Sequence, residues 1–333
     1  MGGPIMFQGF AGVWTPVARA RDLKRRPMPI ELAGERVVLF RGEHGAPAAL
    51  VDRCPHGGTR LSLGAVTRDG RLECPLDGWR FDAGGACAEV PLYPEAPRHL
   101  LSATALPARQ AGGLVWLRTS IGARASDGPD VPRDLEDPRL GHASAVAEWR
   151  CHWTRAVEVL LYPPHREILS RRAGAPNSQF EVLVRDTPRG FAAAWVLDGA
   201  PADAHLEFTR PNGMTVHFTF AGSQVRLHSW CVPLSRSRTR IFLASSRNFG
   251  LWHPVVDRLA WRLMRARQPL AESSEPSEAP LPTGERAIAS DRAARRFRRY
   301  YLDRLRKSSA APTGGWAAAN DPQPELDGWV RAW

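Results

Sequence analysis

Residues 51–82 read VDRCPHGGTRLSLGAVTRDGRLECPLDGWRFD and contain two short loops that each begin with Cys-Pro. The first loop carries Cys54 and His56, and the second carries Cys74 and Asp77. Thiolates, imidazoles and carboxylates are all metal ligands, so the loops together form a candidate metal site. β-rich segments on both sides of this stretch predict an all-β domain over residues 7–118.

The spacing of these residues resembles the cluster-binding loops of Rieske iron–sulfur domains, in which each loop supplies one Cys and one His. The resemblance implies a [2Fe-2S] cluster with two thiolates on one iron and two imidazoles on the other. The segment GWRFD (78–82) also matches the family, but Asp77 takes the place of its second His. We favour an empty site or a disulfide here over the two alternatives, a [2Fe-2S] cluster with a carboxylate ligand or a bound Zn ion.

The chain has 333 residues and a net charge of +11. This length accommodates two domains. We interpret the basic balance as a solvated surface and expect no nucleic-acid partner, because no DNA- or RNA-binding motif accompanies it. The sequence contains no apolar run long enough to predict a membrane span, and the N-terminus lacks the pattern of a signal peptide. The five Cys residues form no regular disulfide framework. Together these features predict a cytoplasmic protein.

The rest of the chain divides into three segments. Residues 119–139 have a linker composition, residues 140–307 predict an α+β domain, and residues 308–333 form a low-complexity tail that contains three Trp. Short turns between strand candidates favour an antiparallel meander. The candidates are Phe180–Arg185, Phe191–Leu197, His205–Arg210, Thr215–Phe220, Val225–Val232 and Thr239–Ser245.

Helices are expected from Trp153, over Trp252–Arg267, and from Ser290 or Asp291 to about Arg306. A curled sheet that grips a helix is similar to the helix-grip (START-like) catalytic domain of Rieske non-haem iron oxygenase alpha subunits. The resemblance implies a homo-oligomer, a trimer in this family. The basic last helix offers an alternative contact for an acidic carrier protein or subunit.

In that family, one helix supplies two His ligands to a mononuclear iron and a bridging Asp, and a later segment supplies a carboxylate. The resemblance places the first His at His165, the second at Ser170 and the bridging Asp at Tyr162. The carboxylate position falls on Pro269, or on Glu272 in a shifted register. Since most of these ligands are replaced, we expect no mononuclear iron.

Loss of the iron would leave an apolar cavity between helix and sheet. We predict Tyr162, His165 and Glu158 as catalytic groups, because such side chains donate hydrogen bonds or act as general acids and bases. Further side chains are predicted to line this substrate pocket: Ser170, Trp195, His217, His228 and Trp230.

These features favour a non-redox enzyme on a degenerate Rieske oxygenase scaffold. The expected reaction is a cyclisation, cycloaddition, rearrangement or elimination of a hydrophobic small molecule in natural-product biosynthesis, helped by proximity within the pocket. One alternative is a non-catalytic partner subunit of an intact oxygenase. Another is an atypical Rieske monooxygenase with Asp77 as a cluster ligand and Glu272 as an iron ligand.

Overall fold

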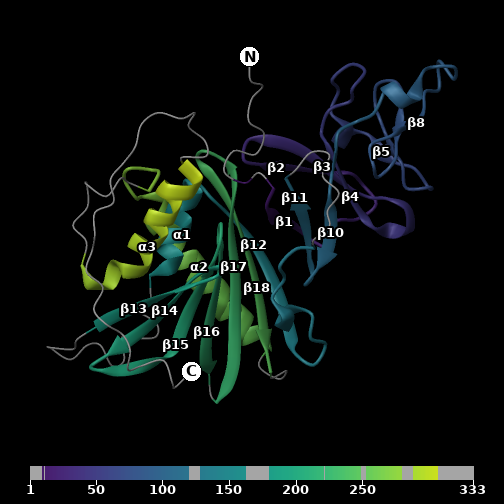
Figure 1. The fold of residues 1–333 in the computed structure, drawn as a ribbon. Coiled ribbons are helices and arrows are strands. Elements are labelled where there is room, and N and C mark those ends of the chain that lie inside the picture. Colours follow the sequence, from purple (N-terminus) through teal and green to yellow (C-terminus); the bar gives the residue numbers. More distant parts are fainter. Residues whose placement is uncertain are drawn as a thin grey trace.

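The computed structural model describes residues 10, 12–119, 128–162, 180–220, 222–248, 253–279 and 288–306. Figure 1 shows a smaller all-β part beside a large curved sheet that carries the helices. This arrangement confirms the predicted fold class, an all-β Rieske-like domain followed by a helix-grip domain. The last strand of the first part ends at Arg118, and the first strand of the second part begins at Gly141.

The first part is built from three small sheets with the orders β1-β11-β10, β2-β3-β4-β9 and β5-β6-β7-β8. Their strands are β1 (Trp14–Arg19), β2 (Met28–Leu32), β3 (Glu35–Arg41), β4 (Pro47–Val51), β5 (Ala65–Val66), β6 (Leu72–Glu73), β7 (Arg80–Phe81), β8 (Cys87–Glu89), β9 (Ala105–Leu106), β10 (Ala108–Ala111) and β11 (Leu114–Arg118). The first Cys loop follows β4, and the second joins β6 to β7. A separate core that includes Phe40, Leu61 and Phe81 supports both loops.

The second part contains one antiparallel sheet with the order β12-β18-β17-β16-β15-β14-β13. Its strands are β12 (Gly141–Trp149), β13 (Phe180–Thr187), β14 (Gly190–Leu197), β15 (Ala200–Thr209), β16 (Gly213–Phe220), β17 (Ser223–Ser235) and β18 (Arg238–Arg247). The predicted meander is therefore confirmed from β13 to β18. The strand β12, which was not predicted, is Ala-rich and owes its conformation to nine paired positions on β18.

The helices of the second part are α1 (Trp153–Leu161), α2 (His253–Glu272) and α3 (Arg292–Tyr300), with short helices η4 (Arg133–Leu135), η6 (Ala289–Asp291) and η7 (Tyr301–Arg306). The helix α1 ends at Leu161 and Tyr162 is extended, as expected for a residue that precedes proline. The helix α2 runs beyond its predicted end at Arg267, with Pro269 in its last turn. No described helix is both long and apolar enough to cross a membrane.

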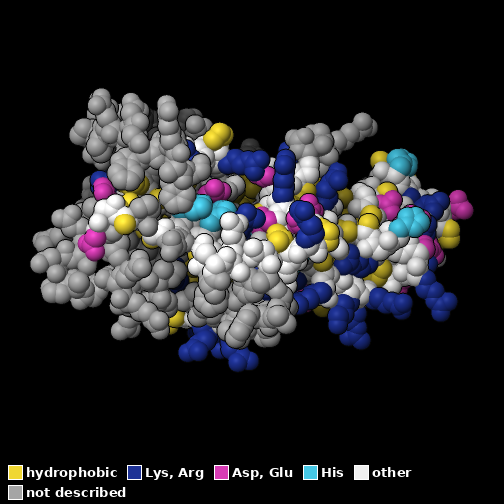
Figure 2. Space-filling view, turned by 90° about the horizontal axis from the view of Figure 1, so that it is seen from below, with side chains coloured by type: hydrophobic (Ala, Val, Ile, Leu, Met, Phe, Trp, Pro, Cys, Tyr) yellow, Lys and Arg dark blue, Asp and Glu magenta, His cyan; other side chains and the backbone are white. Residues whose placement is uncertain are grey.

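Aromatic side chains join the helices to one face of the sheet. Phe208 on β15 contacts Phe297 on α3 edge-on, with ring centroids 5.4 Å apart, and Phe297 contacts Trp153 on α1 at 5.9 Å. The opposite face, at β17, contacts the first part through Trp230 and Trp116, whose centroids lie 5.3 Å apart. Lys and Arg side chains are spread over the described part of the face that Figure 2 shows.

Candidate functional site

The first Cys loop is a tight turn held by two backbone hydrogen bonds. The N–H of Cys54 donates to the carbonyl of Thr59 at 2.8 Å, and the N–H of Gly58 donates to the carbonyl of Cys54 at 2.9 Å. Gly58 has φ +74°, in the left-handed region that glycine adopts without strain.

The second loop repeats this geometry. The N–H of Cys74 donates to the carbonyl of Trp79 at 2.8 Å, and the N–H of Gly78, which has φ +72°, donates to the carbonyl of Cys74 at 3.1 Å. The two Cys residues therefore begin equivalent six-residue turns. In the first turn the possible ligand His56 stands two positions after Cys54, and in the second turn Asp77 stands three positions after Cys74.

The structure brings three of the four predicted ligands of this site together, Cys54, Cys74 and Asp77, and the fourth, His56, is bonded to one of them. The thiols of Cys54 and Cys74 are buried and free, and one donor atom from each lies within 4.8 Å of a carboxylate oxygen of Asp77. His56 bonds through Nδ1 to Oδ2 of Asp77, and its ring stacks on Trp79 with centroids 4.6 Å apart. The thiols thus form the buried floor of the site, and the half-exposed His56 covers it.

Burial dominates the electrostatics of this floor. It raises the pKa of the Cys74 thiol to about 12. Burial also acts to raise the pKa of Asp77, but hydrogen bonds with His56, Cys74 and the N–H of Trp79 outweigh it and lower that pKa. A metal ion that bound here would displace the thiol protons, because thiolate is the ligating form.

The donor set fits a metal centre with two sulfurs, one imidazole nitrogen and one carboxylate oxygen, a combination that zinc accepts. It does not reproduce the two imidazoles of a Rieske cluster. A carboxylate in place of a neutral imidazole adds one negative charge to any cluster held here. The residues that would hold either group are Cys54, His56, Cys74 and Asp77.

In the second part, the two ends of α1 contact side chains of opposite charge on α2. Arg267 donates from Nη1 to the carbonyl of Val159 at 3.1 Å, at the C-terminal end of α1. Glu272 accepts from the N–H of Arg150 at 2.8 Å, just before α1 begins. The carboxylate considered as an alternative iron ligand therefore lies at the far end of α1 from Tyr162, and a guanidinium lies at the near end.

Tyr162 is half-buried at the C-terminal end of α1. Burial, together with the carboxylates of Asp291 and Glu158, raises the pKa of its hydroxyl to about 12. The hydroxyl is protonated at neutral pH and is already hydrogen-bonded with the carboxylate of Asp291. His165 and Ser170, the next predicted site residues, lie outside the described residues.

Glu158 does not serve as a free acid or base. Its side chain is 3% exposed, Oε2 accepts from Nη1 of Arg155 at 2.7 Å, and Oε1 accepts from Nε of Arg298. Both oxygens are thus held by guanidinium groups, and the one from Arg298 joins α1 to α3. These ion pairs favour a structural role for Glu158, and its catalytic role stays a prediction.

The predicted pocket lining is split between the two faces of the sheet. Trp195 is buried on the face that carries the helices, in the core that includes Phe208. By the register of β16 and β17, His217, His228 and Trp230 lie on the opposite face. These residues do not line one cavity, because adjacent strand positions alternate between faces.

His228 has partners that the sequence did not indicate. Its Nε2 lies 2.7 Å from Oδ2 of Asp134, and its Nδ1 lies 3.0 Å from the hydroxyl of Thr215. The hydroxyl of Ser246 donates to the same carboxylate oxygen. Asp134 belongs to the predicted linker, where an acidic residue carries no local signal of a buried role.

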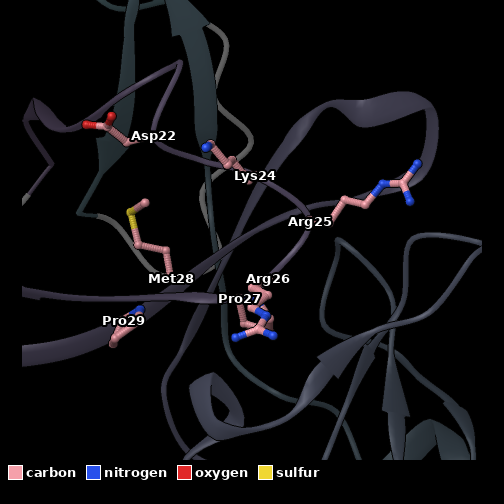
Figure 3. Close-up of a pocket in the computed structure, with 7 residues that line it drawn as sticks. All are labelled: Asp22, Lys24, Arg25, Arg26, Pro27, Met28 and Pro29. Atoms are coloured by element: carbon pink, nitrogen blue, oxygen red, sulfur yellow. The ribbon is translucent and has the colours of Figure 1, made fainter.

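A surface hollow of about 560 Å³ lies between β1 and β2. Its charged side chains include Lys24, Arg25 and Arg26, which are exposed and point away from one another in Figure 3. A hollow whose cationic groups diverge does not converge on one ligand. We assign no function to it.

Comparison with known proteins places these features in a family. Residues 13–102 match the model of the Rieske [2Fe-2S] domain. The chain is 29% identical over 275 residues to chlorophyllide a oxygenase of Chlamydomonas reinhardtii, and 26% identical over 274 residues to the oxygenase component of dicamba O-demethylase of Stenotrophomonas maltophilia. These alignments cover 78% and 73% of the chain.

The two relatives differ in how much of their own length is matched. The chain spans 42% of the chlorophyllide a oxygenase and 80% of the dicamba O-demethylase component. The crystal structure of dicamba monooxygenase bound to dicamba has the same fold, with a TM-score of 0.76 and 21% identity over 91% of this chain and 99% of that one. The chain therefore has an N-terminal Rieske domain and is homologous to alpha subunits of Rieske non-haem iron oxygenases.

Proposed function

We propose that this chain is a redox-neutral enzyme on the Rieske oxygenase scaffold, acting on a hydrophobic small molecule by cyclisation, cycloaddition or rearrangement. The observation that carries the proposal is the position of Arg267 at the C-terminal end of α1. A fixed positive charge there repels a divalent cation. Glu272, the carboxylate considered as a substitute for the ligand expected at Pro269, accepts a hydrogen bond at the other end of α1.

The metal loops have a structural role in this proposal. The buried thiols of Cys54 and Cys74 and the carboxylate of Asp77 already converge, so a bound metal would tie β4 to the β6–β7 loop. Such a centre stabilises the folded domain by binding only the folded state. It requires no electron transfer.

Tyr162 is the candidate catalytic group among the described residues at the C-terminal end of α1. Its protonated hydroxyl, which is hydrogen-bonded with Asp291, would turn from that carboxylate to donate to an oxygen on which negative charge develops. The pocket would supply the remainder by holding a flexible substrate close to its reactive geometry. We expect Tyr162→Phe to lower turnover about 10-fold or more while the melting temperature stays near that of the wild type.

A second candidate, an atypical Rieske monooxygenase, is favoured by the relatives. The matched proteins are named as oxygenases and demethylases, and Asp77 stands where it could ligate a cluster. In this case the chain would require O2 and an electron donor.

Product mass distinguishes the two candidates. Pure protein is incubated with a panel of hydrophobic substrates under strictly anaerobic conditions and without reductant. An isomeric product of unchanged mass supports the first candidate. A product heavier by one oxygen, or a demethylated one, formed only with O2 and a reductant, overturns it and supports the second. Metal analysis on the same protein adds a check, since the first candidate predicts no mononuclear iron.

A further inference from the structure

The face of the sheet turned away from the helices carries a second group of metal-binding side chains. His205 on β15 and His217 on β16 are directly opposed in the antiparallel register. Their rings are stacked, with centroids 4.4 Å apart and planes inclined by 5°. Glu207 stands two positions from His205 and therefore on the same face. Its Oε2 lies 3.9 Å from Nε2 of His217.

We propose that His205, Glu207 and His217 form a binding site for a divalent transition metal of the zinc type. One donor atom from each residue lies within 4.8 Å of the others. Ligand atoms around a tetrahedral zinc with bonds of about 2.05 Å are about 3.3 Å apart. Closing this difference requires the stacked imidazoles and the carboxylate to rotate toward one point.

The bonding state of His217 supports the site. Its Nε2 is buried and has no hydrogen-bond partner among the described residues. A buried polar atom without a partner is uncommon and calls for an explanation such as an ion. A metal bound to Nε2 would satisfy this atom, and the Glu207 carboxylate would balance part of the metal's charge.

The surroundings leave room for a metal and its water ligands. On β14 the positions opposite Glu207 and His205 are Ala192 and Ala194, so no large side chain covers the pair from that strand. The side chain of Glu207 is 54% exposed, which gives a path from solvent. Two imidazoles and one carboxylate leave at least one coordination position open, as in zinc sites that bind water or substrate.

Arg226 is the group that opposes binding. It stands opposite His217 on β17, on the same face. Its positive charge repels a cation, so removing it should strengthen binding. This makes Arg226→Ala a control that changes the same face without removing a ligand.

The test is zinc binding by the full chain, measured by competition with a chromophoric chelator and by zinc content after dialysis. His205→Ala, His217→Ala and Glu207→Gln should each lose one equivalent of zinc relative to the wild type, with an affinity at least about 100-fold lower at the lost site. Arg226→Ala should keep that equivalent. The same zinc content in the wild type and all three ligand variants overturns the proposal, and Glu207→Gln keeps this test valid if a His variant does not fold.

The visible absorption spectrum of bound Co²⁺ distinguishes this site from the Cys loops. Co²⁺ bound by nitrogen and oxygen donors gives weak visible bands without the thiolate charge-transfer absorption of a Cys site. The ligand variants should lose the weak bands alone. If they lose only thiolate charge transfer, or if no nitrogen–oxygen cobalt spectrum forms in the wild type, the sheet site is excluded.

Discussion

Oδ2 of Asp134 lies 2.7 Å from Nε2 of His228, although 94 positions separate the two residues. The side chains are 12% and 2% exposed. The contact fastens η4, which lies between the two parts, to β17 of the large sheet. Ser246 on β18 donates to the same oxygen, so one carboxylate joins three segments.

We expect Asp134→Asn to lower the free energy of unfolding by about 2 kcal/mol, because a buried hydrogen bond to a charged group is lost. Thermal and denaturant unfolding measure the change. Asp137→Asn is the matched control: Asp137 lies three positions away and forms an ion pair with the exposed Arg139, so its variant should unfold near the wild-type midpoint. Equal effects of both substitutions would contradict a specific role for the Asp134–His228 contact.

The same contact predicts a pH dependence. Burial acts to raise the pKa of Asp134, but hydrogen bonds with His228 and Ser246 outweigh it and hold that pKa well below its usual range. A carboxylate with a depressed folded-state pKa stabilises the protein above its unfolded pKa of about 3.9, and this contribution is lost as the pH falls through the folded value. The stability difference between wild type and Asp134→Asn should therefore shrink as the pH falls below about pH 4.

Glu158 provides a test of structural against catalytic roles. Its carboxylate is buried between the guanidinium groups of Arg155 and Arg298. We expect Glu158→Gln to destabilise the protein by about 3 kcal/mol, since the buried Arg155 and the partly buried Arg298 both lose the charge of this carboxylate. When activity and folded fraction are measured over a range of temperatures, any loss of activity in this variant should parallel the loss of folded protein.

Glu148 is a matched control for Glu158 because it also pairs with two arginines, Arg238 and Arg240, but at the surface. Its side chain is 43% exposed. Exposed pairs contribute about 0–1 kcal/mol, so Glu148→Gln should be nearly silent. A Glu158→Gln protein with wild-type stability and no activity would restore Glu158 to the catalytic set.

Local sequence patterns were sufficient for most of the fold. The Cys-Pro loops, the strand patterns and the short turns between them depend on neighbouring residues, so the two Cys turns and the meander from β13 to β18 were predicted. The strand β12 was missed because its Ala-rich sequence has little strand preference. Its conformation comes from pairing with β18, which is distant in the sequence.

The candidate site was predicted less well, for the same physical reason. Whether Glu158 is free or paired depends on Arg298, and the partner of His228 is Asp134. Both partners are remote in the sequence. The division of Trp195 and His217 between two faces requires the register of the sheet, which single-strand periodicity does not give.

The Cys loops give a prediction about metal content. If the Cys loops hold a metal, Cys54→Ser and Cys74→Ser should lose it and melt at a lower temperature, because a metal bound there stabilises only the folded loops. Cys87→Ser should keep both properties. Cys87 is also buried in the core beneath the loops, but it is not among the converging donors. A chelator should lower the melting temperature of the wild type and of Cys87→Ser, and should leave that of Cys54→Ser and Cys74→Ser unchanged.

Asp77→His tests whether position 77 alone separates these loops from a Rieske site. The two turns share their backbone hydrogen bonds, so a His at 77 would complete a set of two thiolates and two imidazoles. We expect this variant, purified anaerobically from iron-supplemented cells, to contain more iron and to show stronger visible charge-transfer bands than the wild type.

Adding His56→Ala to Asp77→His should abolish these bands, because one imidazole is then missing again. Equally strong bands in the wild type would show that Asp77 already serves as a cluster ligand and would favour the monooxygenase candidate. No iron in Asp77→His would mean that the loops differ from a cluster site elsewhere as well. The stacking of His56 on Trp79 is then the next contact to alter, because it fixes the orientation of the imidazole.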